Sequence, residues 1–259
     1  MRPVAVLDHV AVGTSTRGDG WELFGGLLGG AWAYGGNSPG FWWGQLQYSA
    51  GPKVELLTPT SGPDAAFLER FLADRGPGFH HLNFIVPVIE ATLGKIRALG
   101  IEPVGVRLEN PRWKEAFLHP VDAYGTVIQV AEQAGPPPSS SRPADLADLA
   151  DPGRSCSLSL VELRVADIEG ATRLFRDALD GQVVSRSDGT VGAEVELSWQ
   201  NGARLRLAQP AAHSEGSSPP GEGLAFVEFC PDDGIFGPAD REKAATLARR
   251  LGVSVRILT

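Results

Sequence analysis

Histidine, carboxylate and amide side chains stand inside strand-like segments of the first half of the chain. His9 lies in LDHVAVG, Glu55 in KVELLTP, His81 in FHHLNFIV and Gln129 in GTVIQVAE. Imidazole nitrogens and carboxylate oxygens bind divalent metals and move protons, whereas a lone histidine at the start of a strand is usually a structural residue. The chemistry of these residues therefore depends on whether they face one another.

Strand alternation gives a test of that arrangement, because successive side chains point to opposite faces of a sheet. In three of the segments, apolar residues occupy one parity and suit a face covered by a helix. The opposite parity holds Glu55 in the first, His81 and Asn83 in the second, and Gln129 in the third. We predict that these side chains share one face.

The elements around these segments form a repeating pattern. Strand-like VAVLDHVAVG is followed by helix-compatible WELFGGLLGG, which glycines interrupt, by a short strand near residues 31–34, and by the strands FWWGQLQYS and KVELLTP. The order strand, helix and three strands then recurs as FHHLNFIVP, IEATLGKIRALG, IEPVGV, WKEAFLHP and GTVIQVAE. Residues 1–134 are therefore predicted to hold two βαβββ modules.

Residues 135–154 are rich in proline and serine and are predicted to be a linker. A third module follows with SLSLVELRVAD, the helix IEGATRLFRDAL, and the strands GAEVELSW and ARLRLAQP. The fourth has GEGLAFVEF, the helix REKAATLARRLG and VSVRILT, two strands short of the pattern. Residues 155–259 are thus predicted to form a second domain of the same kind.

Modules that open with LDHVAVG and GFHHLNFIV and close with KVELLTP and FLHP…GTVIQVAEQ resemble the vicinal oxygen chelate superfamily. This superfamily includes glyoxalase I, extradiol dioxygenases and antibiotic resistance proteins, and the first domain looks most like methylmalonyl-CoA epimerase. The resemblance covers residues 4–134 well and 156–259 weakly. It implies an α+β fold in which tandem βαβββ modules form half-open barrels, with a second domain that is degenerate and truncated.

Carried over position by position, the resemblance implies a metal site made of His9, Glu55, His81 and Gln129. These ligands leave two positions of an octahedral divalent ion for a chelating substrate, and suit Co, Ni, Mn, Fe(II) or Zn. Glu55 and Gln129 are the expected catalytic residues. Family members mostly have glutamate at the position of Gln129, and this chain has only Gln45 and Gln47 where the epimerase has its second carboxylate, which puts epimerase activity itself in doubt.

Substrate contacts are expected from residues near these positions. Trp43 shares the parity of Gln45 and Gln47, so it lines the site if they do, and otherwise all three belong to the core. Asn83 shares the parity of His81, and Lys114 is a candidate partner for an anionic group, with solvated surface as the alternative. His80 and His119 are expected to be structural. The contact set is Trp43, Gln45, Gln47, Asn83 and Lys114.

The second half lacks the ligand set. Aligning its modules with the first two places Glu162 where His9 stands, Arg206 where Glu55 stands and Phe226 where His81 stands. We predict that Glu162 and Arg206 form an ion pair in place of the ion, because either charge alone would be buried without compensation. This half is therefore expected to have a structural role or to act as a lid.

Composition limits the partners. A formal net charge of −8 argues against a nucleic-acid partner, and the chain has no apolar run long enough for a membrane span and no signal peptide at its start. Cys156 and Cys230 are too few for a disulfide framework and suit a reducing compartment. We expect a cytoplasmic protein with a small-molecule substrate; a homodimer is usual in the superfamily, although two domains of one chain can imitate that pairing.

Three functions compete. The leading interpretation is a metal-dependent isomerase or lyase that acts on an oxygen-chelating molecule through an enolate-like state. The second is an Fe(II) dioxygenase of the extradiol type, for which two histidines and one carboxylate suffice as ligands. The third is a non-catalytic binding or resistance protein, which tightly bound metal would contradict.

Overall fold

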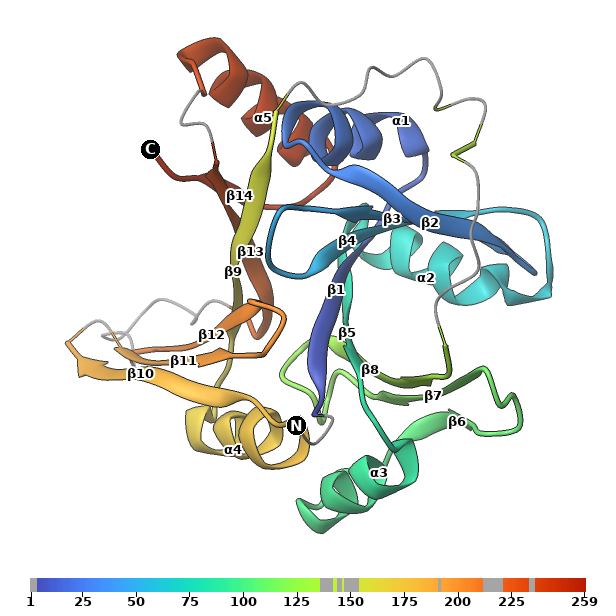
Figure 1. Ribbon diagram of the computed structural model, residues 1–259, viewed down its shortest axis with the longest axis vertical. Helices are drawn as coiled ribbons and strands as arrows, with labels where there is room; N and C mark the ends of the chain where they lie inside the picture. The colour runs from blue at the N-terminus through green and yellow to red at the C-terminus, as the bar shows by residue number, and fades with distance from the viewer. Residues whose placement is uncertain are drawn as a thin grey trace. The chain divides into compact units, whose positions relative to one another are not determined.

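The structure is a computed structural model that describes residues 4–135, 142–143, 146, 154–190, 192–211, 221–232 and 236–259. Its strands form two mixed sheets that curl into half-barrels (Figure 1). The predicted α+β fold of tandem βαβββ modules is confirmed. None of the described helices is long and apolar enough to cross a membrane.

The first sheet has eight strands that belong to two modules. The first module contributes β1, β2, β3 and β4, and the second contributes β5, β6, β7 and β8, with β1 beside β5 at the centre of the order. The strands in spatial order are β2 (Ala31–Ser38), β3 (Phe41–Gln47), β4 (Lys53–Pro59), β1 (Val6–Gly13), β5 (Gly78–Ile85), β8 (Val127–Gln133), β7 (Trp113–Leu118) and β6 (Val104–Arg107).

The second sheet has six strands and follows the same plan. The third module is complete, and the fourth contributes only β13 and β14, as the missing strands of its sequence pattern predict. Its order is β10 (Gln182–Gly189), β11 (Gly192–Ser198), β12 (Arg204–Pro210), β9 (Cys156–Arg164), β13 (Gly223–Pro231) and β14 (Val255–Ile257).

Helices cover the face of each sheet to which the apolar side chains of the strands point. The crossover after β1 is one continuous helical segment, made of α1 (Arg17–Gly20) and the π-helical η1 (Trp21–Leu27). The prediction that the glycines of WELFGGLLGG interrupt this helix is therefore wrong. The corresponding segments of the other modules are α3 (Ile89–Ala98), α4 (Ile168–Arg173) with π-helical η4 (Leu174–Ala178), and α5 (Pro238–Arg250). The sequence analysis missed η2 (Pro63–Ala65) with α2 (Ala66–Arg75), and also β10.

Each half-chain contributes to two compact units. One unit holds residues 1–8, 81–136 and 160–225, and the other holds residues 9–80, 137–159 and 226–259. In the first unit, the Phe84 ring centroid lies 5.8 Å from that of Phe175 and 5.4 Å from that of Trp199. In the second, Phe229 lies 4.9 Å from Tyr48 and 6.3 Å from Phe24. The domain boundaries near residues 134 and 155 stay a prediction, and most of the proposed linker lies outside the described residues.

The predicted ion pair of the second half is present. Arg206 and Glu162 are register partners on β12 and β9, and Arg206 Nη1 lies 3.7 Å from Glu162 Oε2. A second buried carboxylate, that of Glu196 on β11, lies 3.6 Å from Arg206 Nη2. Arg206 therefore lies beside two buried carboxylates on this face, and Glu196 also pairs with Arg204. Phe226, the third aligned position, is buried in the core.

We expect Arg206→Met to destabilise the protein by roughly 2 kcal/mol, because it removes the guanidinium beside buried Glu162 and leaves Glu196 with Arg204 alone. Urea denaturation measures the loss, and the double variant Glu162→Gln with Arg206→Met should recover part of it. Arg186→Met is the matched control, since its partner Glu169 is exposed and surface pairs contribute little. Equal losses in the two single variants would contradict the role of Arg206.

Candidate metal centre

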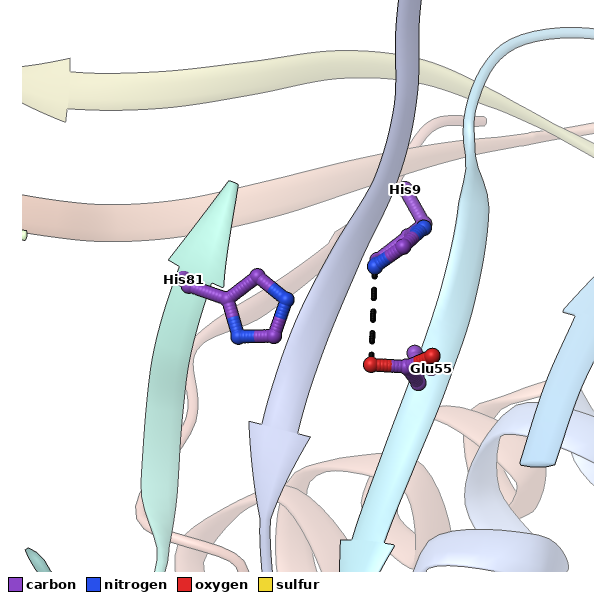
Figure 2. A group of neighbouring side chains, drawn as sticks. All are labelled: His9, Glu55 and His81. Carbon is purple, nitrogen blue, oxygen red and sulfur yellow. Dashed lines mark ion pairs between the residues drawn. The ribbon is translucent and has the colours of Figure 1, made fainter. Parts of the chain in front are cut away.

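The central strands of the first sheet place two histidines and one glutamate together. His9 comes from β1, Glu55 from β4 and His81 from β5, and all three are buried. One ligand atom of each lies within 4.8 Å of the others. Figure 2 shows the three side chains pointing toward one another from their strands. Among the described residues, this is the one group of His, Cys, Asp and Glu side chains with that geometry.

Strand register explains why His9 and Glu55 share a face. In the parallel pairing of β1 with β4, His9 is the partner of Lys53, and Glu55 is the partner of Ala11. Since alternate residues of one strand point to the same side, His9 and Glu55 project from the same face of the sheet. His9 Nε2 lies 3.4 Å from Glu55 Oε2, the ion pair drawn in Figure 2.

Gln45 holds both of these side chains. It is the register partner of Glu55 across β3 and β4, and its Nε2 donates to Glu55 Oε1 at 2.9 Å. The same nitrogen lies 3.2 Å from His9 Nδ1. In this arrangement Nδ1 of His9 accepts, so Nε2 carries the proton and faces Glu55. Gln45, which the sequence predicts to contact the substrate, thus contacts the two predicted ligands His9 and Glu55.

The donor set fits a divalent metal. Two imidazoles and one carboxylate are ordinary ligands for Zn, Fe(II), Co or Ni. Binding through His9 Nε2 would move the ring proton to Nδ1, which then needs an acceptor. The Oε1 atom of Gln45 is buried and has no hydrogen-bond partner among the described residues. Rotation of the amide would let this oxygen accept from Nδ1, in exchange for the hydrogen bond that Nε2 donates to Glu55 Oε1. The orphaned oxygen and the ligand chemistry therefore agree.

Gln129, the predicted fourth ligand, is held by two neighbours. Its Oε1 accepts from Asn83 Nδ2 at 2.8 Å, and its Nε2 donates to Glu115 Oε2 at 2.8 Å. Asn83 is fully buried and is the register partner of Gln129. The oxygen of Gln129 that would bind an ion thus accepts from Asn83, and a ligand set of His9, Glu55 and His81 leaves that hydrogen bond intact.

Glu115 is a carboxylate that the sequence analysis missed. Phe117 is the register partner of Gln129 across β7 and β8, so Glu115, two residues earlier on β7, lies on the same face as Gln129. Its partners are Gln129, Trp113 Nε1 at 3.0 Å and Arg107 at 3.1 Å. The alternation of WKEAFL could have revealed it, because Glu115 has the parity of Trp113 and Phe117.

The remaining predicted contacts lie in different places. Trp43 shares the face of Gln45 and Glu55, and its ring centroid lies 5.9 Å from that of Tyr34. Gln47 is exposed at the end of β3 and donates to the backbone oxygen of Tyr48. These positions are compatible with substrate contacts, which stay a proposal.

Lys114 projects from the face of β7 that is opposite to the face of Glu115 and Gln129. It is the register partner of Glu132, whose parity is opposite to that of Gln129. Its Nζ lies 3.0 Å from Glu90 on α3 and 3.2 Å from Glu132, and these hydrogen bonds raise its pKa. This ion-pair network favours the surface alternative over a substrate contact.

His80 and His119 have structural surroundings, as expected. The His80 ring centroid lies 4.8 Å from that of Phe71 and 5.5 Å from that of Phe67. Burial lowers the pKa of His80 to about 4, against the opposing effect of Glu55 and with a smaller contribution from Arg75. His119 Nδ1 accepts the backbone N–H of Val121 in a turn.

Comparisons with known proteins agree with this fold. Residues 8–117 match the family described as the glyoxalase/bleomycin resistance protein/dioxygenase superfamily, and this segment contains His9, Glu55 and His81. No curated protein sequence matches the chain. Residues 8–117 therefore match the vicinal oxygen chelate superfamily in sequence.

Solved structures of low identity share the fold. A mutant of 4-hydroxymandelate synthase from Streptomyces coelicolor is 11% identical, with a TM-score of 0.62 over 95% of this chain and 76% of that one. A hypothetical protein from Staphylococcus aureus is 13% identical, with a TM-score of 0.57 over 98% and 99% of the two chains. Methylmalonyl-CoA epimerase from Mycobacterium tuberculosis is 23% identical, with a TM-score of 0.43 over 50% of this chain and 89% of its own.

We expect His81→Ala to lose the metal that the wild-type protein binds, because it removes one of three ligands. Elemental analysis of protein purified without a metal-affinity tag should give about one divalent ion per chain for the wild type. His80→Ala is the matched control: it should keep the ion while lowering stability through lost packing against Phe67 and Phe71. Equal metal content in wild type and His81→Ala would contradict the site.

We also expect Gln45→Leu to weaken metal binding about 10-fold or more, because partners of a ligating histidine fix its orientation and tautomer. Competition titration with a chromogenic chelator measures the dissociation constant. Gln47→Leu, an exposed change two residues along the same strand, should leave it within a factor of about two. An unchanged constant for Gln45→Leu would show that its contact with His9 has no role in metal binding.

Proposed function

We propose that this protein is a metal-dependent enzyme that shifts a proton on a small oxygen-chelating molecule, as an isomerase or lyase. The observation that carries the proposal is the buried cluster of His9, Glu55 and His81, each from a different strand, in a segment that matches the superfamily. These residues would hold a divalent ion. When bound, such an ion stabilises negative charge on substrate oxygens as a Lewis acid.

Glu55 is the proposed proton acceptor. It is buried on the face that carries the two histidines, and Gln45 orients its Oε1 by donating to it. A carboxylate in that place takes the α-proton of the substrate, and the electron pair of the broken C–H bond moves onto the adjacent carbonyl to give an enolate-like state. If the carbon that loses the proton carries a hydroxyl, Glu55 can return the proton to the former carbonyl carbon, while the hydroxyl proton passes to the former carbonyl oxygen, and this gives the isomer. Departure of a β-substituent with its bonding electron pair instead gives a lyase product.

Gln129 and Glu115 extend the site on the second module. Gln129 was the second expected catalytic residue, but an amide does not take up a proton at neutral pH. The carboxylate of Glu115 accepts a hydrogen bond from Gln129 Nε2, and this fixes which end of the amide is nitrogen and which is oxygen. We propose that Gln129 binds substrate or ion and that Glu115 positions it.

A second function, Fe(II)-dependent oxygenation, is favoured by one observation. The oxygen of Gln129 is engaged with Asn83, which leaves two histidines and one carboxylate, the ligand set of many non-haem iron oxygenases. Purified protein would then be selective for Fe(II) and would consume oxygen with a catechol or 2-oxo acid. The isomerase or lyase stays the leading proposal, since it requires only groups that the site face provides.

We expect the metal-loaded protein to exchange the α-proton of its substrate class for deuterium. Proton NMR in deuterium oxide, with a panel of 2-acyl thioesters and 2-oxo acids, measures the exchange. Glu55→Gln should slow exchange about 100-fold or more, because its amide retains a ligand oxygen but accepts no proton. Glu69→Gln, on the exposed side of α2, is the control with the same change of charge. Oxygen consumption without exchange would replace this proposal with the oxygenase.

A further inference from the structure

The start of β1 is held by side chains of the second half of the chain. Asn201 Nδ2 donates a hydrogen bond to the backbone oxygen of Leu7 at 2.8 Å, and the backbone N–H of Ala5 donates to Asp180 Oδ2 at 3.0 Å. Ala5 and Leu7 are both buried. All four residues belong to the compact unit that holds residues 1–8, 81–136 and 160–225. Two separate side chains therefore fix the segment that leads into the metal centre.

The pairing of β1 with β4 begins only after this segment. Its parallel register starts at His9, the partner of Lys53, so residues 6–8 of β1 precede it. A buried backbone carbonyl needs a hydrogen-bond donor, because leaving water without one costs free energy. Asn201 supplies that donor to Leu7, two residues before the first metal ligand. The donor to the Leu7 carbonyl thus comes from the second half of the chain and not from β4.

The turn that carries Asn201 is itself fixed. It joins β11 to β12, and within it the backbone N–H of Trp199 donates to the backbone oxygen of Ala203 at 3.0 Å. Asn201 Oδ1 accepts from the backbone N–H of Ala203 at 3.3 Å. The oxygen of the amide is therefore used inside the turn, and its nitrogen is directed to Leu7.

The same turn packs against β5, the strand of His81. Trp199 is buried, and its ring centroid lies 5.4 Å from that of Phe84. Phe84 follows His81 by three residues, so the two side chains leave β5 on opposite faces. The indole N–H of Trp199 donates to the backbone oxygen of Leu179, the residue before Asp180, at 2.8 Å. One connected block of the second half therefore contacts both strands that carry the histidines.

A metal centre depends on this kind of support. A bound ion requires its ligands within about 0.2 Å of the usual distances, and contacts that orient a ligand change the affinity strongly. His9, Glu55 and His81 come from three different strands. The backbone of His9 lies about 7 Å along β1 from that of Leu7, so a shift of Leu7 moves the imidazole relative to the other two ligands.

We propose that Asn201 is a positioning residue for the metal centre, because its hydrogen bond to Leu7 sets the place of His9 relative to Glu55 and His81. This inference rests on the proposed metal-dependent function and adds to it a role for the second half. That half then supports the ligand strands of the first and does not act as a lid. Asn201 is exposed, so its replacement removes no buried packing.

The test is a competition titration of Co(II) with a chromogenic chelator, on wild type and on Asn201→Asp. The new carboxylate keeps an oxygen that accepts from Ala203, but it has no proton to donate to the Leu7 oxygen. We expect the dissociation constant to rise about 5-fold or more, which is less than the effect of losing a direct partner of a ligating histidine. The absorption spectrum at saturating Co(II) should also change, because it reports the geometry of the ligands.

Two variants serve as controls. Asn110→Asp makes the same change in another exposed turn, where Asn110 Oδ1 accepts from the backbone N–H of Arg112. Arg206→Met removes an ion pair of the second half and should lower the stability of the protein. Both should bind Co(II) within a factor of about two of wild type and with the wild-type spectrum. The melting temperature of each variant shows that it is folded.

A second measurement uses wild-type protein alone. Coupling is reciprocal, so an ion that binds better when β1 is held must also strengthen that hold. Saturation with Zn(II) should therefore slow hydrogen exchange at the backbone amides of Ala5 and Ala203, which take part in the contacts of the block, and NMR resolves each amide. The Gly170 amide, which donates to Asp167 at the start of α4, should exchange at an unchanged rate.

The outcomes are distinct. A wild-type protein that binds no ion, even after Co(II) is added, would overturn the proposed function and, with it, this inference. Where wild type binds the ion, an unchanged constant and spectrum in Asn201→Asp would overturn the role of Asn201 alone, and so would an equal change in Arg206→Met. A raised constant and an altered spectrum in Asn201→Asp only would support it. Should that variant fail to fold, slower exchange at Ala5 and Ala203 on metal binding supports the proposal, and unaltered exchange overturns it.

Discussion

The parallel pairing of β1 with β4 is the constraint on which the rest of the site depends. A single register brings His9, Lys53 and Glu55 to one face of the sheet. A slip of one residue in β4 would turn both charged side chains into the layer of Val54 and Leu56, where apolar helices cover the sheet. Burial of those apolar residues therefore fixes the positions of the polar ones.

The superfamily fold and the core of the site could be predicted because both follow from alternation. Strand parity placed Glu55, His81 and Gln129 on one side. Alignment of the modules predicted the ion pair of Glu162 with Arg206, and the second sheet contains it. Resemblance then supplied the equivalence between strands of different modules, which no single segment contains.

Other features needed three-dimensional contacts. The helix α2 packs Leu68 against Ala11 and Leu57, a contact between distant segments that local periodicity did not indicate. The strand β10 is exposed along its whole length, so it has no buried parity to detect. The sequence made Lys114 a candidate partner for an anionic group. In the structure its side chain leaves β7 on the face opposite to Gln129 and pairs with Glu90 and Glu132.

Glu162 in the second half is paired with Arg206, a charge that is part of the chain, whereas the candidate site in the first half would depend on an ion taken from solution. An ion held by His9, Glu55 and His81, as proposed, would exchange with free ions, so its occupancy would vary with the concentration of that ion and with competing chelators. Arg206 is covalently part of the chain and remains charged throughout the physiological range. The pairing of Glu162 with Arg206 in the second half would thus not depend on the supply of a metal ion.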